Sequence, residues 1–391
     1  MKRAFASALF LSLCTLGSAS CSSSSSEGST DGSVQPDLAS NTGTQDMAAA
    51  SPDLAQRPLP TEVLVLRVGS GAAALQANVA TAAFLDRRLI ADGSLVGQPI
   101  ALPTAVSGKN RPLTLSGTGS SEGALTRSPD RRYVLLAGYD ATPGTASVID
   151  NALRIAGRVA SDGSIDTSTQ VDGLNGAGNF IRSAITTDGN AIWLAGVLGI
   201  AYTTLGATGM PAAKLLGSTY NVRVLGLYDG QLYVSRASDT SGGINSVGTG
   251  APMTANVTPK QLSGFPSTGN VLSPFGFVAL DRDTTPGIDV LYVADDRTDG
   301  SGGVQKWMLS GTTWSLAGTL SAGALVGCRG LAGYQNGTST VLIATTSETA
   351  TPTRLITFTD TGTAPGTITA RTLATAGTNT AFRGVALAPE L

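Results

Sequence analysis

The chain has 391 residues, of which 13% are charged, carries a net charge of −2 and contains no histidine. Without histidine, the Ser-His-Asp and Cys-His catalytic arrangements, zinc sites with histidine ligands and histidine general bases are all excluded. The few charges form no basic run of the kind that nucleic-acid binding requires, so we expect no nucleic-acid partner.

Residues 1–20 have the organisation of a bacterial export signal. Lys2 and Arg3 give a positive start, residues 4–16 form an apolar core, and residues 18–20 (SAS) are a small-residue cleavage site. The apolar core is too short to span a bilayer as a helix, which takes about twenty residues. Cys21 follows directly and resembles the lipid-attachment cysteine of bacterial lipoproteins, although serine replaces the leucine that this family prefers three residues earlier.

The resemblance implies that Cys21 carries lipid and holds the protein on a membrane of the bacterial cell envelope, facing the periplasm or the cell exterior. The alternative is ordinary cleavage after Ser20, followed by secretion. Residues 21–60 are rich in Ser, Thr, Gly, Pro and Asp and contain few large apolar side chains. Because such a segment cannot bury enough surface to fold, we predict a disordered linker there and a folded domain over residues 61–391.

A sequence repeat of four predicted strands recurs through this domain. Each copy has a β-branched or aromatic run, a polar turn and a second apolar run, and shorter third and fourth runs follow. The first two runs of the copies lie at residues 122–140, 181–197, 222–238, 275–296 and 328–347. Four-stranded units repeated in this way are typical of the blades of a β-propeller.

The two ends of the domain predict how the ring closes. The last run, Phe382–Pro389, reads as a first strand without a second, whereas Glu62–Gly69 reads as a second strand without a first. Paired, they complete a composite blade and hide both edges. Five internal units and this composite predict an all-β, six-bladed propeller. The alternatives are a seventh blade within residues 111–122, or a pair of β-sandwiches.

Several phrases strengthen this interpretation: SEGAL from Ser121, IRSA from Ile181, LYVADD followed by GGVQK from Leu291, and FRGVALAP from Phe382. With them the domain resembles a group of secreted and lipid-anchored bacterial propeller proteins. The resemblance implies a propeller outside the cytoplasm. It implies no reaction, because a fold alone does not establish a function.

Alignment of the repeats places one residue from the start of each first strand at an equivalent position: Glu122, Arg182, Arg223, Phe275, Arg329 and Arg383. First strands are innermost in a propeller, so we expect these side chains to converge around the central channel. Arginine stays charged when partly buried and grips carboxylate or phosphate in a fork. The four arginines and Glu122 therefore predict a site for an anionic small molecule or glycan.

The alternative for this ring is structural, with each arginine paired to Glu122, to a turn aspartate or to main-chain carbonyls of the next blade. Among so many arginines we expect Glu122 to be ionised, with a depressed pKa, which argues against acid catalysis.

Three further features read as ordinary structure. The aspartates of residues 281–299 are close enough in sequence to suggest calcium, but Asp and Gly are also turn residues, and we predict turns without a metal or cofactor. Trp193, Trp307 and Trp314 are predicted to pack between blades. Cys328, the only cysteine besides Cys21 after the signal, is predicted to be buried, and a disulfide framework is excluded.

These observations favour a lipid-anchored, non-enzymatic propeller that binds an anionic ligand or an envelope protein partner at one face. A structural or adhesive envelope scaffold is the second hypothesis. The third is a lyase or hydrolase of acidic sugars, with Glu122 as acid or base and Arg182, Arg329 and Arg383 holding the substrate carboxylate. That activity requires a raised Glu122 pKa and a second carboxylate or a tyrosine beside it.

Overall fold

The computed structural model describes residues 58–390, apart from residues 237–241, 268–271 and 350–351. The predicted export signal, Cys21 and all but the last three residues of the predicted linker lie outside this range. Within it, no helix is both long and apolar enough to cross a membrane.

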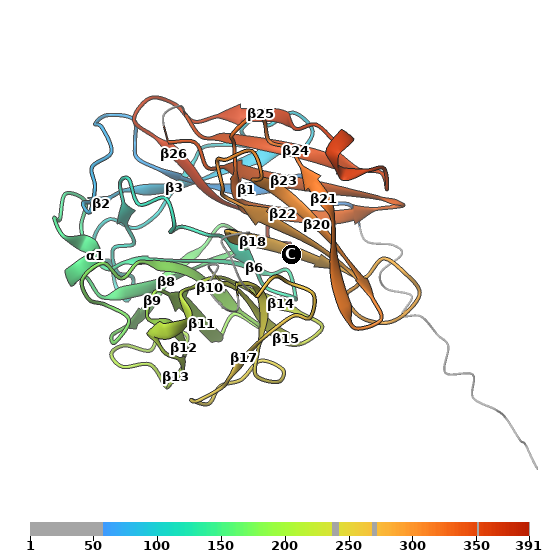
Figure 1. Cartoon of the computed structure of the whole chain (residues 1–391). Coiled ribbons are helices and arrows are strands. Elements are labelled where there is room, and N and C mark those ends of the chain that lie inside the picture. Colours follow the sequence, from blue (N-terminus) through green and yellow to red (C-terminus); the bar gives the residue numbers. More distant parts are fainter. Residues whose placement is uncertain (1–57, 237–241, 268–271, 350–351, 391) are drawn as a thin grey trace, which may run out of the picture. The chain divides into compact units, whose positions relative to one another are not determined.

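The regular secondary structure of the described chain consists almost entirely of strands, and most of these form four-stranded antiparallel sheets (Figure 1). Six such sheets are present among the described residues. In five of them the four strands follow one another in chain order from the innermost outward, and the sixth combines the last strand of the chain with three strands from the start of the domain. This arrangement is a six-bladed β-propeller, as predicted. Successive residues are buried along the strands, as are Val63, Leu64, Val65 and Leu66 in Glu62–Val68, so both faces of a blade pack against its neighbours.

We number the blades from the composite one. Blade 1 contains β26 (Ala381–Leu387), β1 (Glu62–Val68), β3 (Ala83–Leu89) and β4 (Ile100–Ala101). Blade 2 contains β6 (Thr126–Arg127), β7 (Tyr133–Tyr139), β8 (Arg154–Ala160) and β9 (Ile165–Val171). Blade 3 contains β10 (Ile181–Thr186), β11 (Ala191–Gly196), β12 (Gly199–Thr204) and β13 (Ala213–Leu216).

Blade 4 contains β14 (Val222–Tyr228), β15 (Gln231–Arg236), β16 (Gly243–Val247) and β17 (Pro259–Gln261). Blade 5 contains β18 (Pro274–Leu280), β19 (Val290–Asp295), β20 (Gly303–Ser310) and β21 (Thr313–Leu320). Blade 6 contains β22 (Cys328–Asn336), β23 (Ser339–Thr346), β24 (Arg354–Asp360) and β25 (Arg371–Thr375). The helical segments are single turns: α1 (Val148–Asn151), η1 (Ser218–Tyr220) and η2 (Pro365–Thr367).

The two ends of the domain close the ring as predicted. Strand β26 pairs antiparallel with β1, with Val65 opposite Val385. The alternative of a seventh blade is wrong, because residues 111–122 contribute only β5 (Leu115–Ser116), which pairs with β2 (Ala80–Thr81). The sandwich alternative is wrong as well, since the blades are separate sheets rather than two facing layers.

The hydrophobic core lies between blades. Six clusters of buried apolar residues are found within the described residues, and each one spans the interface of two neighbouring blades. The three predicted packing residues belong to these clusters: Trp193 joins blades 3 and 4, and Trp307 and Trp314 join blades 4 and 5. Cys328 is fully buried between blades 5 and 6, as predicted.

Candidate functional site

The predicted ring residues lie where each inner strand begins. Arg182, Arg223, Phe275 and Arg329 are the second residues of β10, β14, β18 and β22, and Arg383 is the third residue of β26. Glu122 differs from the prediction in one respect. It precedes the short strand β6, which starts only at Thr126, so it lies in the entering loop rather than in a strand.

A β-bulge at the start of the inner strand orients most of the ring side chains. In blades 1 and 3 to 6 the pairing between the first two strands shifts at the ring residue, as between Cys328 and Leu331. Such a bulge re-aims a side chain and increases the local twist of the strand. A small residue often follows, because the next blade is close: a Cβ on Gly384 would lie 2.2 Å from the Gly123 carbonyl oxygen.

The ring is closed by interactions between neighbours. The guanidinium of Arg223 lies 4.2 Å from the centre of the Phe275 ring, and that of Arg329 lies 5.5 Å from the same ring. The positive charge of Arg223 lowers the pKa of Arg182, and that of Arg329 lowers the pKa of Arg383, although burial is the larger cause in both cases. Arg383 in turn interacts favourably with Glu122. The predicted convergence of all six positions is therefore present.

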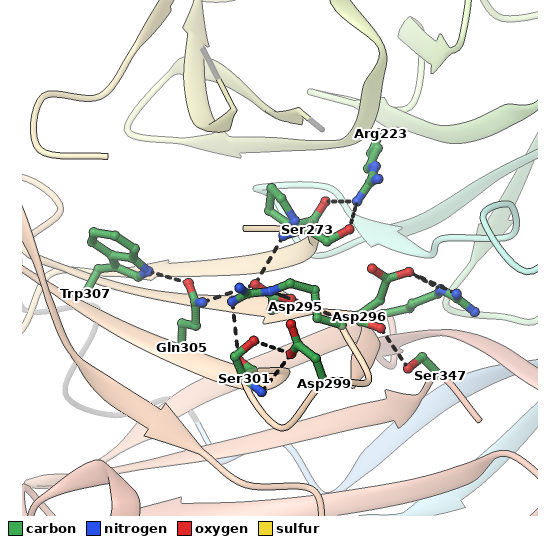
Figure 2. Close-up of polar contacts among 12 residues, drawn as sticks. Arg223, Ser273, Asp295, Asp296, Asp299, Ser301, Gln305, Trp307 and Ser347 are labelled. Atoms are coloured by element: carbon green, nitrogen blue, oxygen red, sulfur yellow. Dashed lines mark hydrogen bonds and ion pairs between the residues drawn. The ribbon is translucent and has the colours of Figure 1, made fainter. Parts of the chain in front are cut away.

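One side of the ring has its acid paired with an arginine, although Nε of Arg223 is buried there without a hydrogen-bond partner, and Figure 2 shows its network. We call Arg223, Phe275, Arg329 and Asp296 the paired half. Asp296, just after β19, accepts from Nε of Arg329 at 2.9 Å and lies 2.9 Å from its Nη2. Arg223 donates from Nη1 to the Ser273 hydroxyl at 2.9 Å and to the Pro274 carbonyl at 3.1 Å.

A buried neighbour stiffens the paired half. Asp295 precedes Asp296 and is fully buried at the end of β19. Its carboxylate accepts from the Ser273 amide at 3.2 Å, from Gln305 at 3.1 Å and from Arg297 at 2.9 Å (Figure 2). Because Ser273 also receives the Arg223 contact, the Asp295 network fixes the position of that arginine.

The opposite side of the ring is the unpaired half, which we define as Glu122, Tyr139, Arg182 and Arg383. Arg182 donates from Nη1 to the Asn221 side chain at 2.7 Å and to the Val222 carbonyl at 2.9 Å, and Arg383 donates from Nη2 to the Gly117 carbonyl at 2.7 Å. Other polar atoms of these side chains are buried without a hydrogen-bond partner among the described residues: Arg182 Nε, Arg383 Nη1, Tyr139 Oη and both Glu122 carboxyl oxygens.

Burial decides the charge of Glu122. The side chain is only 3% exposed. Desolvation raises its pKa to about 8, and the nearby Arg383 guanidinium and Tyr139 hydroxyl only partly offset this effect. The predicted depressed pKa is wrong. The nearby arginines alone would lower the pKa of Glu122, but its burial has the larger and opposite effect. In addition, Arg383 donates to the Gly117 carbonyl instead of forming a close ion pair with Glu122.

Two residues of the site were missed by the sequence prediction. Tyr139 is the last residue of β7, and its hydroxyl interacts with the Glu122 carboxyl. Tyr139 lowers the pKa of Glu122, and Glu122 raises the pKa of Tyr139. Arg154, fully buried at the start of β8, lies 4.8 Å from the centre of the Tyr139 ring and donates to the carbonyls of Ile149, Ala152, Leu174 and Asn179. Neither residue belongs to a first strand: Tyr139 lies on the second strand of blade 2 and Arg154 on the third, so the equivalence of first strands does not point to them.

The contacts of the arginines are those that the structural alternative described. Arg182 and Arg223 each donate to a main-chain carbonyl of the next blade, and Arg329 pairs with a turn aspartate. The unpartnered atoms of the unpaired half are not accounted for by that alternative. A buried polar atom without a partner costs about 1–3 kcal/mol, and more when it is charged.

The predicted acidic turn is formed by Asp281, Asp283 and Asp289, whose carboxylates can approach within 4.8 Å of one another. Asp289 accepts from the amides of Arg282 at 2.8 Å and Asp283 at 2.9 Å, and Asp281 accepts from Gly287 at 3.3 Å. These are bonds of aspartates that cap turn amides, as predicted for turn residues.

A separate groove lies on blade 6 beside Ile90 of blade 1. Its volume is about 470 Å³, and it is lined by Tyr334, Arg371 and several threonines, including Thr359 and Thr369. None of the ring residues lines this groove.

Comparison with known proteins adds solved structures of distant similarity. No family model and no curated protein sequence matches the chain. It is similar to a periplasmic gluconolactonase of Pseudomonas aeruginosa, with 16% identity over 81% of this chain and 83% of that one and a TM-score of 0.44. It is also similar to a putative 6-phosphogluconolactonase of Bacteroides fragilis, with 12% identity over 80% and 82% of the two chains and a TM-score of 0.44. The fold assignment itself rests on the strand topology of this chain.

Proposed function

We propose that this propeller is a binding module for an anion, held at the ring of Arg182, Arg223, Arg329 and Arg383. The observation that carries the proposal is the set of buried guanidinium N–H groups without partners, at Arg182 Nε, Arg223 Nε and Arg383 Nη1. A carboxylate or phosphate offers acceptor oxygens to such donors, and charge-assisted hydrogen bonds are the strongest available to them.

The charge balance of the ring supports the proposal. Four guanidiniums face one another, and Asp296 is the single close carboxylate partner among them in the described structure. Because burial keeps Glu122 protonated up to about pH 8, it does not neutralise the remaining positive charge at neutral pH. A bound anion would lower the mutual repulsion that already depresses the pKa of Arg182 and Arg383.

We further propose that the module works in the bacterial cell envelope, anchored to a membrane through lipid on Cys21 and a linker over residues 21–60. The export signal, the cysteine after it and the serine-rich segment support this location. An envelope protein could be the carrier of the anionic group.

The test uses the domain of residues 58–391, which contains every strand of the closed ring. Its thermal unfolding is measured with acetate, citrate, D-glucuronate, sulfate and phosphate. An anion at 100 times its dissociation constant should stabilise the fold by about 2.7 kcal/mol. Arg182→Gln and Arg383→Gln should each reduce this stabilisation.

The control for lost charge is Arg371→Gln, since Arg371 is exposed on β25 outside the ring. This variant should respond to the anion as the wild type does. If no anion shifts the wild type while Arg383→Gln melts early, the arginines only hold blades together. The scaffold hypothesis would then replace the binding module.

One observation favours a second candidate, a lyase or hydrolase of acidic sugars. That hypothesis requires a raised Glu122 pKa and a tyrosine beside it, and the raised pKa of Glu122 and the nearby Tyr139 hydroxyl fit both requirements. Absorbance of unsaturated products and release of reducing ends from polygalacturonate would detect elimination and hydrolysis respectively. Loss of either activity in Glu122→Gln, with anion binding retained, would support catalysis.

A further inference from the structure

The unpaired half brings together polar groups from three consecutive blades; Glu122 and the Tyr139 hydroxyl interact, but none of the buried atoms named above forms a close, well-aligned hydrogen bond with another. Arg383 belongs to blade 1, Glu122 and Tyr139 to blade 2, and Arg182 to blade 3. Arg383 Nη1 and the Glu122 carboxyl would form an ion pair if they were turned toward each other, but no such bond is present between these described residues. The two residues are nevertheless neighbours, since a Cβ on Gly123, directly after Glu122, would lie 3.2 Å from Cβ of Arg383.

The chemistry of these atoms defines what would satisfy all of them. Arg182 Nε and Arg383 Nη1 can only donate, so they require an acceptor such as a carboxylate. Tyr139 can donate and accept, and a carboxylic acid donates from one oxygen and accepts at the other. A hydroxyl group complements the last two, because it donates and accepts at once.

We propose that the unpaired half selects a sugar acid, in which Arg182 and Arg383 hold the carboxylate while Glu122 and Tyr139 bind a neighbouring hydroxyl. This inference rests on the proposed anion-binding function and adds the ligand class to it. Sulfate or a plain fatty acid would satisfy the arginines but would leave the acceptor oxygen of Glu122 without a donor.

The surroundings of Glu122 favour recognition in its neutral form. Gly119 packs against the carboxyl, and a Cβ at this glycine would lie 1.9 Å from Oε1 of Glu122, so the carboxyl is held in a confined position. The charged and titratable groups that face it are Arg383 from β26, Tyr139 from β7 and Arg154 from β8, and its charge is also felt by Arg182 from β10. Arg154 is committed to four carbonyls, so it is not available to the ligand.

The arginines are the only members of the unpaired half whose polar groups a ligand could contact from solvent in this conformation. Arg182 and Arg383 are each 8% exposed, whereas the carboxyl oxygens of Glu122 and the hydroxyl of Tyr139 are enclosed. The proposed binding therefore requires one or both guanidinium groups to move and open a path to Glu122.

The experiment compares two ring acids of similar size by titration calorimetry: D-glucuronate, which carries hydroxyls, and cyclohexanecarboxylate, which does not. The wild-type domain should bind D-glucuronate at least about tenfold more tightly, because a site built to hydrogen-bond a hydroxyl rejects the analogue that lacks it. Glu122→Gln keeps a neutral donor and acceptor and should retain the preference. Glu122→Met, which is apolar and of similar volume, should bring the affinity ratio close to one.

Tyr139→Phe is the second variant and guards against misfolding of Glu122→Met; it should lower the ratio without changing the fold. Equal wild-type affinity for both acids, abolished by Arg383→Gln, would overturn the sugar-acid proposal and leave the anion-binding function standing. An unchanged ratio in both Glu122→Met and Tyr139→Phe would overturn it too. If neither acid, sulfate nor phosphate binds, the anion-binding function itself fails.

Discussion

Each half of the ring contains two arginines at strand bulges and one acid, yet the two acids differ in pairing and burial. In the paired half, Asp296 lies 2.9 Å from Arg329, and Phe275 fills the space between Arg329 and Arg223. In the unpaired half, Glu122 lies near Arg383 but bonds neither to it nor to any other described residue.

The difference follows from where each acid originates. Asp296 comes from the end of a second strand, where the neighbouring Asp295 network holds the chain and where 16% of the side chain is exposed. Glu122 comes from an entering loop and is enclosed, so its ionised form is penalised by desolvation. Proximity to an arginine is therefore not enough to keep an acid charged; the geometry of the bond and the access of water decide it.

The same acid-to-amide change in the two halves gives the sharpest contrast. Asp296→Asn removes the counter-charge of Arg329 and should lower the free energy of unfolding by about 3 kcal/mol, at the low end for buried pairs because both groups keep some exposure. Glu122→Gln replaces a neutral acid by a neutral amide that does not titrate, so at pH 7 it should not lower the free energy of unfolding and should raise it, because the unfolded wild type gains by releasing the Glu122 proton. Urea denaturation at pH 7 measures both.

Equal losses for the two variants would show that Glu122 is ionised and paired in solution, and would remove the distinction between the halves. A small effect of Asp296→Asn alone would mean that Arg329 is adequately held by Phe275 and solvent.

The fold was readable from the sequence because its rules are local and repeated. The turn residues and the β-branched runs predict each blade, and the unpaired first and second runs at residues 382–389 and 62–69 predict the closure. The ring followed from the same alignment, since equivalent strand positions must converge on one axis.

The protonation of Glu122 and the hydrogen bonding of the ring side chains could not be predicted from the sequence, because they depend on burial and on residues outside the repeat. Nothing in the sequence around Glu122 indicates that Gly119 will enclose its carboxyl or that Arg383 will turn to the Gly117 carbonyl. Tyr139 and Arg154 enter the site from outer strands, which the alignment of inner strands does not connect to it.

A second contrast concerns two buried tyrosines. Tyr292 in β19 donates to Asp360 at 2.6 Å, and Asp360 also lies 2.7 Å from Lys306. Tyr292→Phe should lower the free energy of unfolding by about 2 kcal/mol, because hydrogen bonds to charged groups contribute about 1.5–3 kcal/mol. Tyr139→Phe removes a hydroxyl that has no partner in the described structure, and should be neutral or slightly stabilising. Thermal and urea denaturation of both variants measure the difference; a loss in Tyr139→Phe as large as in Tyr292→Phe would place a strong bond at the Tyr139 hydroxyl.

The last contrast is in the pH dependence of stability, and its sign follows from Glu122. The ordinary pKa of this group is 4.5 and burial raises it to about 8, so between these values the folded protein holds a proton that the unfolded chain has released. The folded state binds more protons there, and its stability must fall as the pH rises from about 4.5 to 8, by at most about 1.4 kcal/mol per pH unit from this group. Glu122→Gln cannot titrate, so the variant should lose this slope and gain on the wild type as the pH rises. Other groups cancel in the difference between the two proteins, measured by urea denaturation at half-unit steps. A difference that stays constant from pH 5 to 8 would mean that Glu122 ionises at its ordinary pKa, and the unpaired half would then hold a carboxylate after all.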